Sequence, residues 1–297
     1  MSPLLMETGW RIAGTVVPLI IMVGAGFLYA RRTHTDMTVA NRLNMDVFTP
    51  ALIFSVMSAK SFDPLSHVAL AVACAGLVLG SGVLVWPLCR VLGFRVRTFV
   101  PPMMFNNSGN LGIPLLVLAF GEAALPAAVV LFLVSTLLHF TVGMAIVSGR
   151  ASVAATLRSP IILATAAGLV WSATGQAMPP MLKTPIDMLG QIAIPLMLFA
   201  LGVRMTGIDF SHWRAGAWGA VLCPLSGVIM ALIMVPVLGL DSTESRYLIL
   251  FGALPPAVLN YMVAERYQQE PEVVASVVLI GNLASLVFIP LTLGFVL

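Results

Sequence analysis

Long apolar runs alternate along this chain with short polar segments. The runs cover residues 10–30, 41–59, 65–90, 98–119, 125–148, 160–177, 186–205, 214–238, 246–264 and 272–296. A helix needs about 20 apolar residues to cross the hydrocarbon core of a bilayer, and each run is close to that length. The pattern therefore predicts an all-α integral membrane protein with ten transmembrane helices.

Composition supports a chain that lies almost entirely in lipid. Of the 297 residues, 59% are hydrophobic and 9% are charged, whereas about a quarter of the residues of a typical soluble protein are charged. The net charge is +3, but no basic run of the kind that binds nucleic acid is present. The three cysteines lie in or beside apolar runs without the spacing of metal ligands. We expect no nucleic-acid partner and no metal site.

The basic residues favour one side of the membrane. Alternate loops of a ten-helix protein face the same side, and one set of loops holds eleven of the fifteen basic residues. These loops are residues 31–42, 90–97, 149–159, 204–214 and 265–271. Because cytoplasmic loops carry the excess of lysine and arginine, both termini are predicted to lie outside the cytoplasm. The expected location is the cell (inner) membrane, which the chain would cross many times.

The two halves of the chain resemble each other weakly. Aligning Pro18 with Pro160 also aligns Gly26 with Gly168, and FTPALIF in the second run resembles AIPLMLF in the seventh. Residues 1–148 and 149–297 would then form two repeats of five helices. An odd number of helices makes the second repeat begin on the opposite face of the membrane. Such inverted repeats are typical of secondary transporters, which bind substrate near the midplane at interrupted helices.

Two predicted helices contain residues that interrupt a helix near its middle. The run 98–119 contains NNSGNLGIP, and the run 246–264 contains two consecutive prolines followed by an asparagine. Unpaired amides and freed backbone groups each cost several kcal/mol in hydrocarbon, which favours broken helices beside a protein-enclosed cavity. N-terminal ends of half-helices at the midplane would favour a small anion such as a carboxylate. The alternative is a packing seam in which asparagine hydrogen bonds join neighbouring helices.

The segments NNSGNLGIPL and PPAVLNYMVAERY, with FTPALIF, resemble the auxin efflux carrier family of membrane transporters, over the whole chain. That family includes bacterial organic-anion permeases and plant auxin exporters. The resemblance implies an elevator fold like that of the bile-acid symporters, with helices 4 and 9 crossing. Helices 1, 2, 6 and 7 would form a scaffold domain and a homodimer contact. Helices 3–5 and 8–10 would form a mobile transport domain.

The predicted site combines the asparagines of the two interrupted runs with the prolines that the resemblance places at the crossing of helices 4 and 9. The expected substrate-binding residues are Asn106, Asn107, Asn110, Pro114, Pro255, Pro256 and Asn260. The last helix departs from the family's serine-threonine pair, with Gly281–Asn282 and Ser285 in its place. That difference affects the polar detail of the pocket.

Three further polar residues are candidates for ion coupling or for the pocket: Asp46, His139 and Asn282. An acid within a span is functional by default, but Asp46 could instead reach water or pair with Arg42 near the helix end. A single histidine in an apolar helix is more often a core residue than a proton carrier. Both interpretations stay open for Asp46 and for His139.

The function that the sequence favours is secondary active transport of small organic anions such as carboxylates, and the resemblance to the auxin efflux carrier family implies efflux. The alternative on the same fold is a cation-coupled symporter or proton antiporter. A membrane-embedded enzyme is disfavoured because no His-Glu-x-x-His motif, aspartate pair or serine-histidine pairing is readable. A channel is disfavoured because a two-fold repeat with broken helices is typical of alternating access. No nucleotide-binding loop is present, and we expect no cofactor.

Overall fold

The computed structural model describes residues 3–33, 35–60, 62–149, 157–207 and 211–297. Within these ranges the secondary structure is helical, apart from an isolated antiparallel β-bridge between Asn106 and Pro256. The predicted all-helical class is confirmed. In the described part of the chain, six helices are long and apolar enough to cross a membrane, namely Met6–Thr33, Leu65–Val91, Glu122–Ser148, Pro180–Arg204, Trp213–Leu238 and Pro271–Val296. Two shorter apolar helices cover Ser108–Phe120 and Pro160–Ala173.

The first five predicted runs correspond to helices that are in several places composite. The α-helices are α1 (Pro3–Thr33), α2 (Thr38–Leu43), α3 (Thr49–Met57), α4 (Val68–Val91), α5 (Val96–Met104), α6 (Ile113–Phe120), α7 (Leu125–Leu138) and α8 (Met144–Ser148). Three π-helical segments interrupt or precede them, η1 (Asn44–Phe48), η3 (Ser108–Gly112) and η5 (His139–Gly143). Such π-helical turns inside α-helices are frequent at functional sites.

The second five runs correspond to α10 (Pro160–Ala173), α11 (Pro180–Arg204), α12 (Trp213–Leu238), α13 (Ser242–Gly252), α14 (Leu259–Arg266) and α15 (Pro271–Val296). The run expected at 160–177 ends at Ala173 because Gly175 adopts a positive φ of 67°. The run expected from residue 186 begins six residues earlier, at Pro180, since proline suits the first turn of a helix. The expected cytoplasmic loops 149–159 and 204–214 lie partly outside the described residues.

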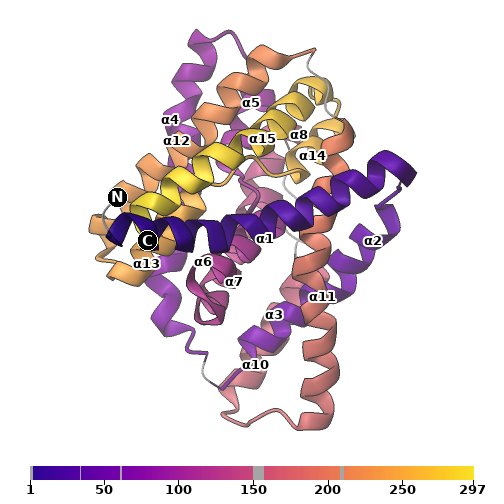
Figure 1. The fold of residues 1–297 in the computed structure, drawn as a ribbon, viewed down its shortest axis with the longest axis vertical. Coiled ribbons are helices and arrows are strands. Elements are labelled where there is room, and N and C mark those ends of the chain that lie inside the picture. The colour runs from indigo at the N-terminus through magenta and orange to yellow at the C-terminus, as the bar shows by residue number, and fades with distance from the viewer. Residues whose placement is uncertain (1–2, 34, 61, 150–156, 208–210) are drawn as a thin grey trace.

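The helices pack in two groups (Figure 1). In one group α1 packs along α11, and α3 packs on both α10 and α11. In the other, α12 packs on α15, α4 and α13, while α4 also packs on α5 and α7. Glycine allows the close contact of α1 with α11, because a Cβ at Gly202 would lie 1.9 Å from the carbonyl oxygen of Val23.

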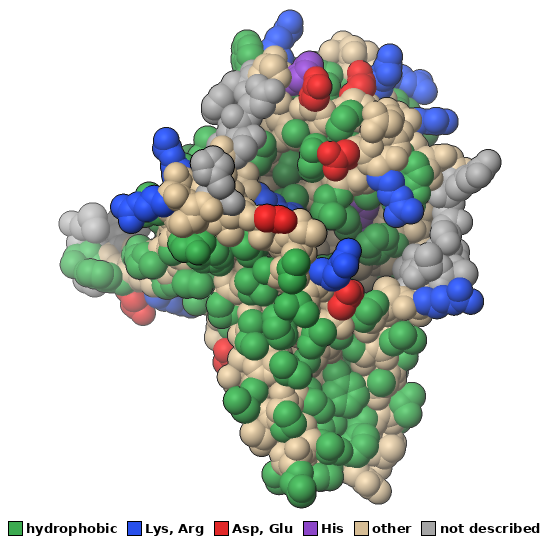
Figure 2. Space-filling view, turned by 90° about the vertical axis from the view of Figure 1, so that its right-hand side faces the viewer, with side chains coloured by type: hydrophobic (Ala, Val, Ile, Leu, Met, Phe, Trp, Pro, Cys, Tyr) green, Lys and Arg blue, Asp and Glu red, His purple; other side chains and the backbone are tan. Residues whose placement is uncertain are grey.

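The surface separates apolar and charged side chains. Figure 2 shows a lower part covered largely by hydrophobic side chains, while lysines and arginines gather toward the upper part. The lower part in this view is where α10 and the beginning of α11 lie in Figure 1. Large apolar side chains are exposed there, among them Val170, Met181 and Leu182. An exposed apolar surface of this extent suits contact with lipid or with another membrane helix.

Candidate functional site: two interrupted helices that meet

Two of the predicted spans, 98–119 and 246–264, are interrupted in the middle, one in each half of the chain. The two interruptions lie against each other. One is the segment between α5 and η3, and the other is the segment between α13 and α14. Two main-chain hydrogen bonds join them: the Asn107 N–H donates to Pro255 O at 2.7 Å, and the Ala257 N–H donates to Phe105 O at 2.9 Å. The chains run antiparallel at this point. A short two-stranded ladder therefore replaces the helical hydrogen bonds that each segment loses.

Proline creates the gap that an asparagine from the other half fills. Pro255 has no N–H, so the carbonyl of Phe251, four residues earlier, lacks its helical donor. The Asn106 side-chain amide donates to this carbonyl at 2.7 Å. A reciprocal bond runs from the Asn260 amide to Phe105 O at 2.8 Å. Each interruption is thus satisfied by an asparagine of the opposite segment, and both asparagines are buried.

The contact of residues 105–107 with residues 255–257 is called the crossing below, and the last helix, α15, supports it from one side. The Asn107 amide donates to Asn282 Oδ1 at 2.9 Å, and the Asn282 amide donates to Pro256 O at 3.0 Å. A Cβ on Gly281 would lie 2.7 Å from Pro256 Cδ, so glycine is what permits α15 to approach this closely. Asn282, predicted from the sequence as a possible pocket residue, is therefore part of the same polar cluster. Ser285 donates to Asn282 O at 2.6 Å and extends it.

Asn110 differs from the other asparagines of the crossing. It is only partly buried, and its side chain makes no hydrogen bond within the described residues. Relative to the β-bridge it occupies the position that corresponds to Asn260 in the other half. Asn260 uses its amide to hold the crossing, whereas the amide of Asn110 stays available. Its segment, η3, packs against α11 and α7.

Main-chain donors are also available beside Asn110. Among the described residues, the N–H groups of Gly109 and Asn110 at the start of one half-helix have no acceptor. The same is true of Val258 and Leu259 at the start of the other. All four groups lie within one turn of the bridge. Pro114, at the first turn of α6, is buried and supplies no competing donor.

Histidine reaches the crossing through a ring contact. His139, in η5, is buried and stacks on Phe105 with ring centroids 4.3 Å apart and planes 8° from parallel. Gly143 makes room for this stack, because a Cβ there would lie 2.7 Å from the Phe105 ring. Asp46, by contrast, lies exposed in η1, and no ion pair joins it to Arg42. The structure brings His139 to the crossing and does not bring Asp46 there.

The chemistry of the site is that of a neutral, donor-rich binding surface. Neither interrupted segment, 105–112 or 253–260, contains a charged residue. Across the described part of the chain, no group of three His, Cys, Asp or Glu side chains is arranged to hold a metal ion. Two buried acceptors, Asn106 Oδ1 and Asn260 Oδ1, have no partner among these residues. N–H donors at helix starts favour an anion, and nearby unpaired oxygens suit a hydroxyl or a protonated carboxyl group.

Sequence reasoning missed Phe105. Its carbonyl accepts two hydrogen bonds at the crossing, and its ring positions His139. A phenylalanine within an apolar run carries no signal of such a role. Its position directly before the asparagine pair is the one feature that indicates it.

Comparison with known proteins identifies a family and several relatives of this chain. The model of the family described as "Membrane transport protein" matches residues 11–155 and 144–293. A "Putative malonate transporter" of Rhizobium meliloti (strain 1021) is 26% identical and aligns with 93% of this chain and 92% of its own length. An "Uncharacterized transporter" of Methanothermobacter thermautotrophicus is 25% identical, with 93% and 96% covered. "Auxin efflux carrier component 8" of Arabidopsis thaliana is 26% identical over 46% of this chain and 38% of its own.

The family match covers nearly the whole chain, and it is a match to transporters rather than to enzymes. With the long apolar helices, it makes this a multi-pass membrane protein. The chain belongs to the membrane transport protein family, the family of the auxin efflux carriers.

Proposed function

We propose that this protein is a secondary active transporter that exports small organic anions, such as carboxylates. One observation carries the proposal: at the start of both half-helices, pairs of main-chain N–H groups have no acceptor among the described residues, and the Asn110 amide beside them has none there either. Partial positive charge at helix N-termini stabilises an anion without a fixed cation that would retain it. The "Putative malonate transporter" among the relatives is in keeping with a carboxylate.

Asn110 is the residue that we propose touches the substrate most directly. Asn106, Asn107 and Asn260 have their amides committed to the crossing, so their part in the site is to hold its shape and to offer their oxygens. Pro114, Pro255 and Pro256 set where the half-helices begin, and hence where the free N–H groups lie.

The transport cycle that we propose is alternating access of the elevator type. It rests on ten spans in two inverted repeats of five, 1–148 and 149–297. The group of α1–α3, α10 and α11 would be the scaffold, and the group of α4–α8 and α12–α15 would carry the substrate. The packing of η3 against α11 supports a site at the boundary between the two groups. Movement of one group along the other would expose that boundary to each side in turn.

Orientation and assembly are part of the same proposal. The excess of basic residues in one set of loops favours both termini outside the cytoplasm, in the inner membrane. We propose a homodimer through the scaffold, for which the exposed apolar side chains of α11, such as Met188 and Ile192, offer a surface.

Proton coupling is the second candidate, and the stack of His139 on Phe105 favours it. A proton on His139 would place a charge against the ring of Phe105, the residue whose carbonyl accepts two hydrogen bonds at the crossing. In that case transport would be a proton-coupled exchange or symport on the same fold. A His139→Gln variant that transports with an unchanged pH dependence would exclude this role.

The experiment that tests the binding site compares three variants of the full-length protein. Asn110→Ala should weaken malonate or succinate binding about tenfold or more, because a hydrogen bond to a charged acceptor is worth roughly 1.5–3 kcal/mol and about 1.4 kcal/mol is one decade. Its melting temperature without ligand should stay close to that of the wild type. Asn41→Ala, a half-buried asparagine of α2, is the matched control and should change neither. Asn106→Ala should lower the melting temperature instead.

Binding is measured as ligand-dependent thermal stabilisation in detergent, and transport as exchange of radiolabelled malonate in proteoliposomes. If Asn110→Ala binds and exchanges the acids as the wild type does, the proposed site is wrong. Failure of a wide panel of carboxylates to stabilise or exchange with the wild-type protein would argue against the substrate class itself.

A further inference from the structure

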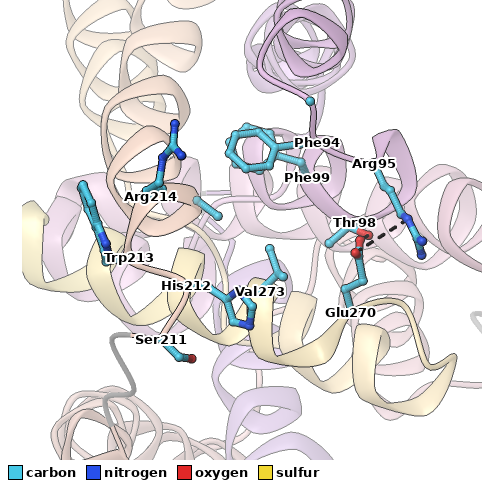
Figure 3. A pocket seen from close by; sticks show the side chains of 12 residues that line it. Phe94, Arg95, Thr98, Phe99, Ser211, His212, Trp213, Arg214, Glu270 and Val273 are labelled. Carbon is cyan, nitrogen blue, oxygen red and sulfur yellow. Dashed lines mark hydrogen bonds and ion pairs between the residues drawn. The ribbon is translucent and has the colours of Figure 1, made fainter.

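A cavity lies at one end of the helices, away from the crossing. It has a volume of about 290 Å³ and is formed where α5, α12 and α15 begin (Figure 3). Its lining comes from the segments 93–99, 211–215 and 270–273. All three segments adjoin loops that the distribution of basic residues places on the same, cytoplasmic side. None of the residues of the crossing contributes to it.

Among the described charged residues around this cavity, one cation lacks a partner. Arg95 Nε lies 3.7 Å from Glu270 Oε1, and Thr98 donates to the other oxygen of Glu270 at 2.6 Å. Glu270 is therefore satisfied by its own side of the cavity, as the dashed lines of Figure 3 indicate. Arg214 lies on the opposite side, on α12, and has no ion pair or hydrogen bond within the described residues. Its guanidinium offers up to five donors to a ligand.

Other polar groups near the cavity add hydrogen-bond donors and do not neutralise the charge of Arg214. His212 lines the cavity, and its Nε2 lies 3.6 Å from Glu272, which does not line it. The main-chain N–H groups of Trp213 and Arg214, at the start of α12, have no acceptor among the described residues. Among the described residues, the cavity thus presents two arginines and free N–H groups against one carboxylate, Glu270, which is already paired. That combination suits a phosphate group.

An apolar groove begins where the cavity ends. It has a volume of about 340 Å³ and is lined by Trp213, Arg214, Ala217, Trp218 and Val221. Trp213 and Arg214 line both spaces, so the groove adjoins the cavity at these two residues. The two tryptophans are 60% and 44% exposed. Exposed apolar side chains continue along the same helix at Leu225 and Ile229.

We propose that this cavity and groove together bind an anionic phospholipid. The phosphate would occupy the cavity beside Arg214, and an acyl chain would lie in the groove and continue along α12 toward the bilayer centre. A free inorganic anion would use the cavity alone and would leave the groove without a role. Tryptophans favour the membrane interface, and basic residues beside them attract anionic lipid headgroups. The inference depends on membrane location and not on the transported substrate.

The test uses purified full-length protein in detergent and three ligands: short-chain phosphatidylglycerol, phosphatidylcholine with the same chains, and inorganic phosphate. Dissociation constants come from the rise of the melting temperature with ligand concentration. Phosphatidylglycerol should bind the wild type at least tenfold more tightly than either of the other two. Arg214→Gln should weaken phosphatidylglycerol binding roughly tenfold, the loss expected for a charge-assisted contact.

Two further variants make the result specific. Arg97→Gln removes the same charge from the start of α5, on the same side of the protein, but Arg97 does not line the cavity. It should leave phosphatidylglycerol binding within about twofold of the wild type, a few tenths of a kcal/mol. Trp218→Ala should weaken phosphatidylglycerol binding and leave phosphate binding unchanged.

Each contrary result overturns the proposal. Equal losses in Arg97→Gln and Arg214→Gln would mean general charge attraction. Phosphate binding as tight as that of phosphatidylglycerol would mean a site for a free anion. Equal binding of phosphatidylcholine would mean an unspecific lipid surface. Since Arg214 is exposed, Arg214→Glu provides a second variant, and it should abolish phosphatidylglycerol binding in a protein that still melts cooperatively.

Discussion

Replacing Asn106 with alanine tests whether the asparagine substitutes for the hydrogen bond that proline removes. In the structure the Phe251 carbonyl accepts the Asn106 amide at 2.7 Å, and its other donor, the Leu254 N–H, is at 3.3 Å. Phe251 is 1% exposed, so its carbonyl depends on donors within the protein. Asn106→Ala therefore leaves a buried carbonyl with a single long hydrogen bond.

The expected change in the free energy of unfolding combines the loss of one hydrogen bond with the removal of one unpaired oxygen. A buried acceptor that loses its partner costs about 1–3 kcal/mol. The alanine also removes Asn106 Oδ1, a buried oxygen that has no partner among the described residues, and this offsets part of the cost. We expect Asn106→Ala to lower the free energy of unfolding by about 1–2 kcal/mol. The Asn41 side chain has no hydrogen bond to the described residues, so Asn41→Ala should change that free energy by less than about 0.5 kcal/mol.

A double-mutant cycle with Pro255→Ala isolates the cause. Alanine at position 255 restores an N–H that can donate to the Phe251 carbonyl, so the carbonyl no longer depends on Asn106. In that background Asn106→Ala should cost about 1 kcal/mol less than in the wild type. The assay is reversible unfolding in mixed micelles, with helicity followed by circular dichroism. Strictly additive costs, or an Asn106→Ala variant as stable as the wild type, would refute this account of the crossing.

Two glycine contacts make further predictions. A Cβ at Gly202 would lie 1.9 Å from a main-chain oxygen of α1, so Gly202→Ala should lower the free energy of unfolding by about 1–3 kcal/mol. Gly24→Ala is the control: a Cβ there has nothing within 4 Å, so this variant should be as stable as the wild type or slightly more stable. Gly281→Ala would place a Cβ 2.7 Å from Pro256 Cδ and should slow malonate exchange in proteoliposomes several-fold; Gly294→Ala on the same helix, with its nearest neighbour at 3.7 Å, should leave the exchange rate unchanged. Melting curves and exchange rates of these four variants check both statements, and equal behaviour within either pair would contradict the corresponding one.

Much of the fold can be predicted from hydropathy and from the positions of the prolines. Apolar runs identify helices because each backbone group in lipid must be satisfied within its own segment, which is a local requirement. The interruptions were also readable locally, since tandem prolines and a cluster of amides disfavour a continuous helix wherever they occur. Helix ends were less readable. The early start of α11 at Pro180 depends on how the first turn is accommodated, and hydropathy is insensitive to that.

Only the tertiary structure distinguished the asparagines from one another. In the sequence Asn106 and Asn110 are equivalent amides one turn apart, and both are expected to meet the substrate. In the structure the partner of Asn106 is Phe251, 145 residues away, while Asn110 has none among the described residues. Asp46 and His139 were likewise equal candidates until packing placed only His139 against Phe105. The cavity beside Arg214 unites three segments that no local pattern connects. The physical reason is the same in each case: local sequence determines where a helix must break, but the hydrogen-bond partner of each freed group is supplied by whichever distant segment packs against it.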